Sequence, residues 1–79
     1  MAETVKSKRL KFKAGEQRQF LNQALDKLDV SNKEVAKLLK ISVRTITDWK
    51  REKFSILESA ALLLSKRSGV IIPKSAKVI

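Results

Sequence analysis

The sequence predicts an all-α fold: a compact bundle of four or five helices, with a basic flexible arm before it and an extended tail after it. Three observations support this fold class. The length of 79 residues suits one domain, apolar residues recur at helical spacing in four segments, and Ser, Gly and Pro stand where those segments begin and end. We therefore divide the chain into an arm at 1–13, a helical domain at 14–72, and a tail or the start of a further region at 73–79.

The arm is strongly basic. Five cations fall within eight residues that contain no acid, and they are Lys6, Lys8, Arg9, Lys11 and Lys13. Their mutual repulsion and the scarcity of apolar side chains predict a flexible segment. Two interpretations stay open, a solubilising tail or an arm that follows phosphates or enters a minor groove. Phe12 interrupts the basic run, and we expect it to anchor the arm to the core.

The first helix is expected over about 15–28. Phe20, Ala24 and Leu28 are spaced at i, i+4 and i+8, and Leu21 and Leu25 lie beside them. This spacing places all five side chains in one broad apolar stripe. The residues between them are polar or charged, so the helix is amphipathic and requires an apolar partner.

The second helix has a well-marked start. Ser31 followed by Glu34 forms a capping box, in which each side chain accepts a hydrogen bond from a backbone N–H near the other residue. Val35, Leu38 and Leu39 are expected on its buried face, and the helix is expected to end near position 40.

A third helix follows almost at once. Ser42 is expected to be its N-cap, and Ile46 and Trp49, three residues apart, are expected to face the core. Trp49 has a second interpretation as a platform for base stacking. Two helices joined so tightly cross at a steep angle, which leaves the outer face of the second one protruding, and a helix of this width fits the major groove of DNA.

The fourth helix is expected to start with another capping box, Ser55 with Glu58, and to end at Gly69 in a left-handed conformation. Five of its apolar residues are interpreted as core, and they are Leu57, Ala60, Ala61, Leu63 and Leu64. Beyond it, Pro73 follows a β-branched stretch at 70–72. Two interpretations of this tail stay open, an extended segment that covers the bundle or the beginning of a region that lies further along the chain.

The composition narrows the function classes. Eighteen basic and eight acidic residues give a net charge of +10 and a pI near 10.3, which favours a polyanionic partner. The chain has no Cys and no His, so thiolate zinc sites are excluded and the commonest general base is missing. We expect no enzyme activity, catalytic residue, cofactor, bound metal, small-molecule ligand or membrane association. A cytoplasmic, nucleoid-associated location is expected.

Positions 31–50 carry a resemblance to a known family. Ala36 in the second helix, Leu-x-Ile-Ser at 39–42, Ile46 and Trp49 in the third helix, and Ser55 before a Leu-rich helix all match. With these residues the stretch from about 20 to 70 resembles the helix-turn-helix of the Cro/repressor-type (XRE-like) DNA-binding domains. The resemblance implies a bundle of the repressor-like helix-turn-helix type that binds double-stranded DNA.

This sequence departs from the family pattern in two places. Lys40 stands at the turn where the family usually has Gly. After the Trp, the family tends to have Glu, a basic or polar residue and Gly, whereas this chain has Lys50-Arg51-Glu52-Lys53. Both departures therefore affect the backbone conformation expected at the turn and in the loop that leads to the fourth helix.

The resemblance implies roles for individual residues. Val43, Arg44, Thr47 and Asp48 would face base edges, and Arg44 has the guanidinium geometry that pairs with guanine O6 and N7. Phosphate contacts are assigned to Asn32, Lys33, Ser42, Thr45, Lys50, Arg51 and Lys53. Two alternatives stay open, that Asp48 pairs with Arg44 or Arg51 along its own helix and that Arg44 is merely solvated.

Three uses of such a domain were compared. A sequence-specific transcriptional regulator is favoured, and such proteins commonly bind symmetric half-sites as homodimers. A module that targets a larger nuclease or recombinase to DNA is the alternative. RNA or ribosome binding is weaker, because RNA readers usually display exposed aromatic side chains and the chain has no Tyr.

Overall fold

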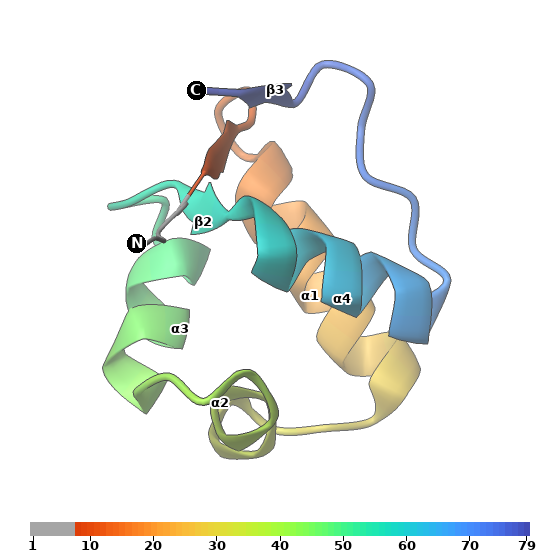
Figure 1. The fold of residues 1–79 in the computed structure, drawn as a ribbon. Coiled ribbons are helices and arrows are strands. Elements are labelled where there is room, and N and C mark those ends of the chain that lie inside the picture. The colour runs from red at the N-terminus through yellow and green to blue at the C-terminus, as the bar shows by residue number, and fades with distance from the viewer. Residues whose placement is uncertain (1–7) are drawn as a thin grey trace, which may run out of the picture.

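The computed structural model describes residues 8–79, which form four helices around one core and a small antiparallel sheet at one end of it (Figure 1). Lys6 lies outside the described residues. The helices are α1 (Glu16–Leu28), α2 (Asn32–Leu39), α3 (Val43–Lys50) and α4 (Glu58–Ser68), and the strands are β1 (Arg9–Lys11), β2 (Ile56–Leu57) and β3 (Lys77–Val78). Within 8–79 no helix combines the length and the apolar character that a membrane crossing demands.

The starts of α2 and α3 follow from local chemistry. The capping box is confirmed, because Ser31 Oγ accepts from Glu34 N at 3.2 Å and the Glu34 carboxylate accepts from Ser31 N at 2.9 Å. Ser42 is likewise confirmed as the N-cap of α3, where its Oγ accepts from Thr45 N at 3.1 Å. Each cap satisfies backbone N–H groups that have no partner inside the helix.

Left-handed residues end the first, second and fourth helices. Gly69 ends α4 with φ 80°, as its sequence position predicts. Asp29 and Lys40 end α1 and α2 with φ 55° and 59°. Lys40 thus adopts the conformation that the family's Gly would favour, although its Cβ makes that conformation costly by about 1 kcal/mol.

The core lies among all four helices. It also receives Leu10 from β1 and Ile56 from β2. Its largest fully enclosed members include Trp49, Phe20 and Leu21, so the interpretation of Trp49 as a core residue is confirmed. Ala60, Ala61 and Leu64 supply the buried face of α4. One expectation for the core was wrong: Leu38 is 38% exposed, because the buried face of α2 is centred on Val35 and Ala36.

The sheet corrects the all-α prediction. Its strand order is β2-β1-β3, with β1 antiparallel to both neighbours. Leu10 is 6% exposed and belongs to the core, while Arg9 and Lys11 on either side of it are exposed. The expectation of a flexible arm is therefore wrong for Arg9–Lys11: one buried apolar residue and two neighbouring strands order this segment despite its charge. Phe12, as expected, packs against the core, with its ring 5.8 Å from that of Phe20.

The start of α4 also differs from the expectation. The helix begins at Glu58 behind Leu57, and Ser55 is not its cap. Residues 56 and 57 are extended because they pair with β1, and Ile56 is fully buried there. Glu58 N donates to Lys8 O at 2.8 Å, so a backbone carbonyl just before β1 satisfies the N–H that Ser55 Oγ would have bound in the expected capping box.

The C-terminal segment runs from α4 back to the sheet (Figure 1). Val70 and Ile72 pack against the core, which agrees with the interpretation of the tail as a cover. Ser75 Oγ donates to Glu16 Oε1 at 2.6 Å, and Ile79 N donates to Arg9 O at 2.9 Å. Residues from both ends of the described chain thus lie in one sheet.

Candidate nucleic-acid interface

The candidate interface is built on α2 and α3, whose axes cross steeply in Figure 1. Only residues 40–42 separate the two helices. Ile41 N donates to Ala36 O at 2.9 Å, which closes the turn. Ala36 is 2% exposed and Ile46 is fully buried. A small residue at the crossing lets the helices approach closely, and the apolar contact fixes their angle.

The outer face of α3 presents the residues assigned to base reading. Val43 is 43% exposed and Arg44 is exposed, so both side chains are free to contact a ligand. Thr47 is half-buried, and its Oγ1 donates to Val43 O at 3.1 Å, which leaves its methyl group and its lone pairs for a partner. These three residues therefore share one accessible strip along the helix.

Asp48 is placed differently from those three. It is half-buried and lines a hollow of about 280 Å³ together with Thr45, Trp49, Phe54 and residues of the sheet. The hollow lies beside α3, between that helix and the β1–β2 edge. The structure therefore brings Asp48 to the flank of the strip.

Ser42 and Thr45 are engaged with each other at the start of α3. Their hydroxyl oxygens are 2.9 Å apart, and Ser42 Oγ also accepts from Thr45 N. Ser42 is exposed, so the capped N-terminus of α3 remains open to solvent. The helix dipole makes such an end attractive to an anion, which is compatible with the phosphate role assigned to both residues.

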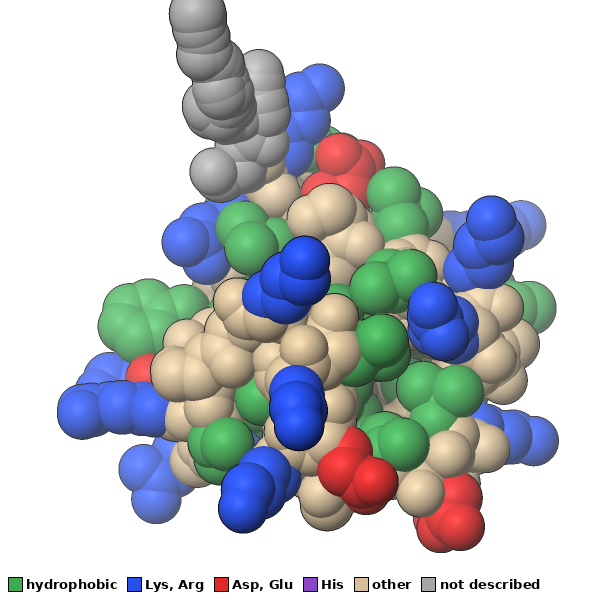
Figure 2. Space-filling model, turned by 60° about the horizontal axis from the view of Figure 1, so that its bottom comes forward, with side chains coloured by type: hydrophobic (Ala, Val, Ile, Leu, Met, Phe, Trp, Pro, Cys, Tyr) green, Lys and Arg blue, Asp and Glu red, His purple; other side chains and the backbone are tan. Residues whose placement is uncertain are grey.

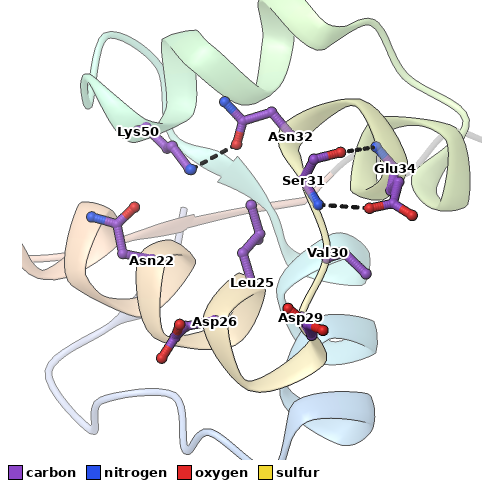
Figure 3. A pocket seen from close by; sticks show the side chains of 9 residues that line it. All are labelled: Asn22, Leu25, Asp26, Asp29, Val30, Ser31, Asn32, Glu34 and Lys50. Atoms are coloured by element: carbon purple, nitrogen blue, oxygen red, sulfur yellow. Dashed lines mark hydrogen bonds between the residues drawn. The ribbon is translucent and has the colours of Figure 1, made fainter.

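Asn32 and Lys50 are brought together from different helices. Lys50 Nζ donates to Asn32 Oδ1 at 2.6 Å, and both side chains are half-buried (Figure 3). They border a hollow of about 570 Å³ between the end of α1 and the start of α2. Lys33 is exposed on the next position of α2. The ammonium group of Lys50 thus lies at the N-terminus of α2, so its charge adds to the positive end of the helix dipole there.

The loop after α3 carries the remaining phosphate candidates. Arg51 and Lys53 are exposed, and Lys53 N donates to Asp48 O at 2.9 Å to close the helix end. Glu52 adopts a left-handed conformation with φ 60°. The loop therefore makes the same kind of helix end that a Gly would make, with Glu in its place.

Glu52 compensates for this strain by capping α1. Gly15, the N-cap of that helix, has no side chain, and the Glu52 carboxylate accepts from Gly15 N at 2.8 Å and from Arg18 N at 3.1 Å. These backbone N–H groups, Gly15 first, hold the pKa of Glu52 below its ordinary value. Arg18 Nε in turn donates to Lys50 O at 3.0 Å. The end of α3 is thereby tied to the start of α1.

Gln17 fixes the same loop from beneath. It is 4% exposed, and its Nε2 donates to Trp49 O and to Phe54 O, both at 2.8 Å. Its Oε1 accepts from Ile56 N at 3.1 Å. One buried amide therefore bridges α1, the end of α3 and β2, and holds the backbone of residues 49–56 in place.

The sequence-based reasoning missed Gln17, Glu52 and Phe54. Gln17 stands one helical turn before Phe20 and Leu21 on the apolar stripe, so a polar residue on a buried face was the available signal. Glu52 and Phe54 gave no comparable signal, because their roles depend on contacts with α1.

Basic side chains are distributed over much of the surface. Figure 2 shows Lys and Arg spread across the face that includes α2 and the start of α3, where acidic side chains are sparser. At the opposite end, Arg9 and Lys11 are exposed on β1, and Lys11 pairs in register with Lys77 of β3. Lys8 and Lys13, just outside β1, are exposed as well. The described arm residues are thus ordered on or beside the sheet.

Comparisons of this chain with known protein families, with curated proteins and with solved structures find no match.

Proposed function

We propose that this domain binds double-stranded DNA by placing α3 in the major groove, as a helix-turn-helix does. The observation that supports this most is the accessible strip of α3. Val43, Arg44 and Thr47 line it, and the crossing with α2 holds it away from the core. The strip offers an apolar group for a thymine methyl, a guanidinium for guanine and a hydroxyl for either kind of base edge.

The charges around this strip support the same proposal. Lys33, Lys50, Arg51 and Lys53 lie at the start of α2, the end of α3 and the loop behind it. Cations on both sides of a reading helix are placed to contact the phosphates that border a groove. A net charge of +10 adds a long-range attraction to any polyanion.

The proposed contacts are of two kinds, and they differ in what they recognise. Arg44 reads sequence, because a bidentate pair with guanine discriminates by about 1–3 kcal/mol. The lysines position the domain without reading sequence. We propose transcriptional regulation as the use of this binding, because a domain of this size needs no more than selective binding to act as a regulator.

The test is selection of bound duplexes from a random pool, with Arg44→Ala as the variant and Lys66→Ala as a matched control. Both residues are exposed cations, but Lys66 lies near the end of α4. Wild type and the control are expected to enrich one shared motif, and Arg44→Ala is expected to lose preference at one position of it. Failure of wild type to enrich any motif refutes sequence-specific binding, and an unchanged motif with Arg44→Ala refutes the role of Arg44.

A further inference from the structure

Phe54 is an exposed aromatic side chain on a rigid loop. Its side chain is 53% exposed, yet its backbone is fixed on both sides. Phe54 O accepts from the buried Gln17 amide at 2.8 Å, and the next carbonyl, Ser55 O, accepts from Arg9 Nη1 at 2.7 Å. An exposed ring costs solvation free energy, and a loop held this firmly does not fold it away.

The ring stands between two hollows. The one of about 280 Å³ adjoins α3 and is lined by Thr45 and Asp48, together with Arg9. The other, of about 330 Å³, is lined by Lys11, Lys13, Lys53 and others. Lys53 Nζ lies 5.8 Å from the ring centroid, and Lys53 lines only the second hollow. Among the described residues that line the hollow beside α3, Arg9 is the one cation, so the ring face toward that hollow lies beside a guanidinium.

We propose that this ring face and Arg9 form a subsite for one nucleotide of the DNA strand that passes along the flank of α3. The inference rests on the proposed function and adds to it an apolar contact outside the major-groove strip. The deoxyribose of the nucleotide packs on Phe54, since the base faces of a duplex are covered by stacking, and its phosphate is held by Arg9. Arg9 uses one Nη1 hydrogen bond on Ser55 O, and within residues 8–79 its other donors remain for the phosphate.

The chemistry of the surroundings favours a nucleotide over a protein side chain. A nucleotide of a duplex presents an apolar sugar edge next to an anionic phosphate, and it does so whatever its base. The subsite offers the matching pair, an aromatic face beside a guanidinium. Lys11, Lys13 and Lys53 behind the ring make the whole loop attractive to a phosphate backbone.

The experiment compares binding of a selected duplex by wild type, Phe54→Ala and Phe54→Trp across a salt series. Leu62→Ala is the matched control, because Leu62 is 54% exposed but lies on α4, outside both hollows. We expect Phe54→Ala to lower the affinity about tenfold through the loss of apolar contact area, Phe54→Trp to retain it and Leu62→Ala to leave it unchanged. The slope of log affinity against log salt is expected to be the same for wild type and Phe54→Ala, since no charge is removed.

Several outcomes overturn the inference, and they are separable from failure of the proposed function. If the wild type binds no duplex, the proposed function itself is refuted. If Phe54→Ala binds the duplex with wild-type affinity, the proposed subsite is refuted and duplex binding stands. If Phe54→Ala loses binding to single-stranded RNA of the same sequence but keeps duplex binding, the ring contacts RNA and the proposed DNA subsite is refuted. A lower mass of Phe54→Ala than of wild type in sedimentation shows that a second copy covers the ring. Because the ring is exposed, the urea midpoint is expected to be equal in all variants, which excludes unfolding as the cause.

Discussion

Replacing Gln17 by Leu tests whether one buried amide organises the loop behind α3. The substitution keeps the side-chain volume but removes three hydrogen bonds, to Trp49 O, Phe54 O and Ile56 N. At roughly 1 kcal/mol for each bond, with a further 1–2 kcal/mol for the orphaned Ile56 N, the loss is about 4–5 kcal/mol. Burial of the new apolar side chain offsets about 1–2 kcal/mol. The expected net cost is therefore about 2–4 kcal/mol.

The assay is urea unfolding followed by circular dichroism, with Gln19→Leu as the control. Gln19 is exposed on the same helix, so its substitution is expected to change stability by less than about 0.5 kcal/mol. With a denaturant slope near 1 kcal/mol per M, Gln17→Leu should lower the midpoint by about 2–4 M. Hydrogen exchange of the Ile56 amide should also become faster. A cost below about 1 kcal/mol together with a protected Ile56 amide would refute the reasoning.

Three further predictions concern single residues. Lys40→Gly is expected to raise stability by about 1 kcal/mol, because φ is 59° there, whereas Lys37→Gly inside α2 should lower it by about the same amount in the same thermal or urea assay. The lowered pKa of Glu52 means that its ionised form stabilises the fold above the ordinary carboxyl pKa, and that this stabilisation is lost as the pH falls through the lowered value. Stability of wild type should accordingly fall more steeply than that of Glu52→Gln in urea titrations below about pH 4, and parallel curves contradict the cap. Lys77→Glu should stabilise the domain by roughly a few tenths of a kcal/mol at low salt. Lys77 pairs in register with Lys11, so the substitution replaces a like-charge pair by an opposite-charge pair. Lys74→Glu, outside the strands, is its control, and an equal effect of both substitutions shows that the cross-strand pair contributes nothing.

Local chemistry explains which parts of the fold were predictable. Ser31, Glu34 and Ser42 act on backbone groups within three residues of themselves, so the starts of α2 and α3 were visible in the sequence. The apolar spacing in α1 likewise identified its buried face. These features require no knowledge of the rest of the chain.

The sheet was unpredictable for the opposite reason. Each strand has two or three residues, too few for a period-2 pattern, and Leu10 pairs with Ile56 and Val78, which are distant in sequence. The charges around Leu10 favoured a flexible segment, and tertiary pairing overrode them. Ser55 failed as a cap for the same reason, because the residues after it are drawn into pairing with β1.

The candidate interface divides in the same way. The family resemblance placed Val43, Arg44 and Thr47 together with Asp48, and the structure exposes the first three along one strip of α3 while Asp48 lies at its flank. The loop that carries Lys53 and Phe54 was not predictable, since its shape depends on hydrogen bonds from α1. The sequence therefore predicted the part of the candidate interface that lies on α3 and did not predict the loop after it.

The central position of β1 has a consequence for the order of folding. The crossing of α2 and α3 closes a short loop, whereas β1 must wait for β2 and then for β3 near residue 78. Closing such long loops costs chain entropy before the contacts return any free energy, so high-separation pairings form late. During synthesis from the N-terminus, Arg9–Lys11 is made first and completed last, so this basic segment stays without its final strand partner until nearly the whole described chain exists.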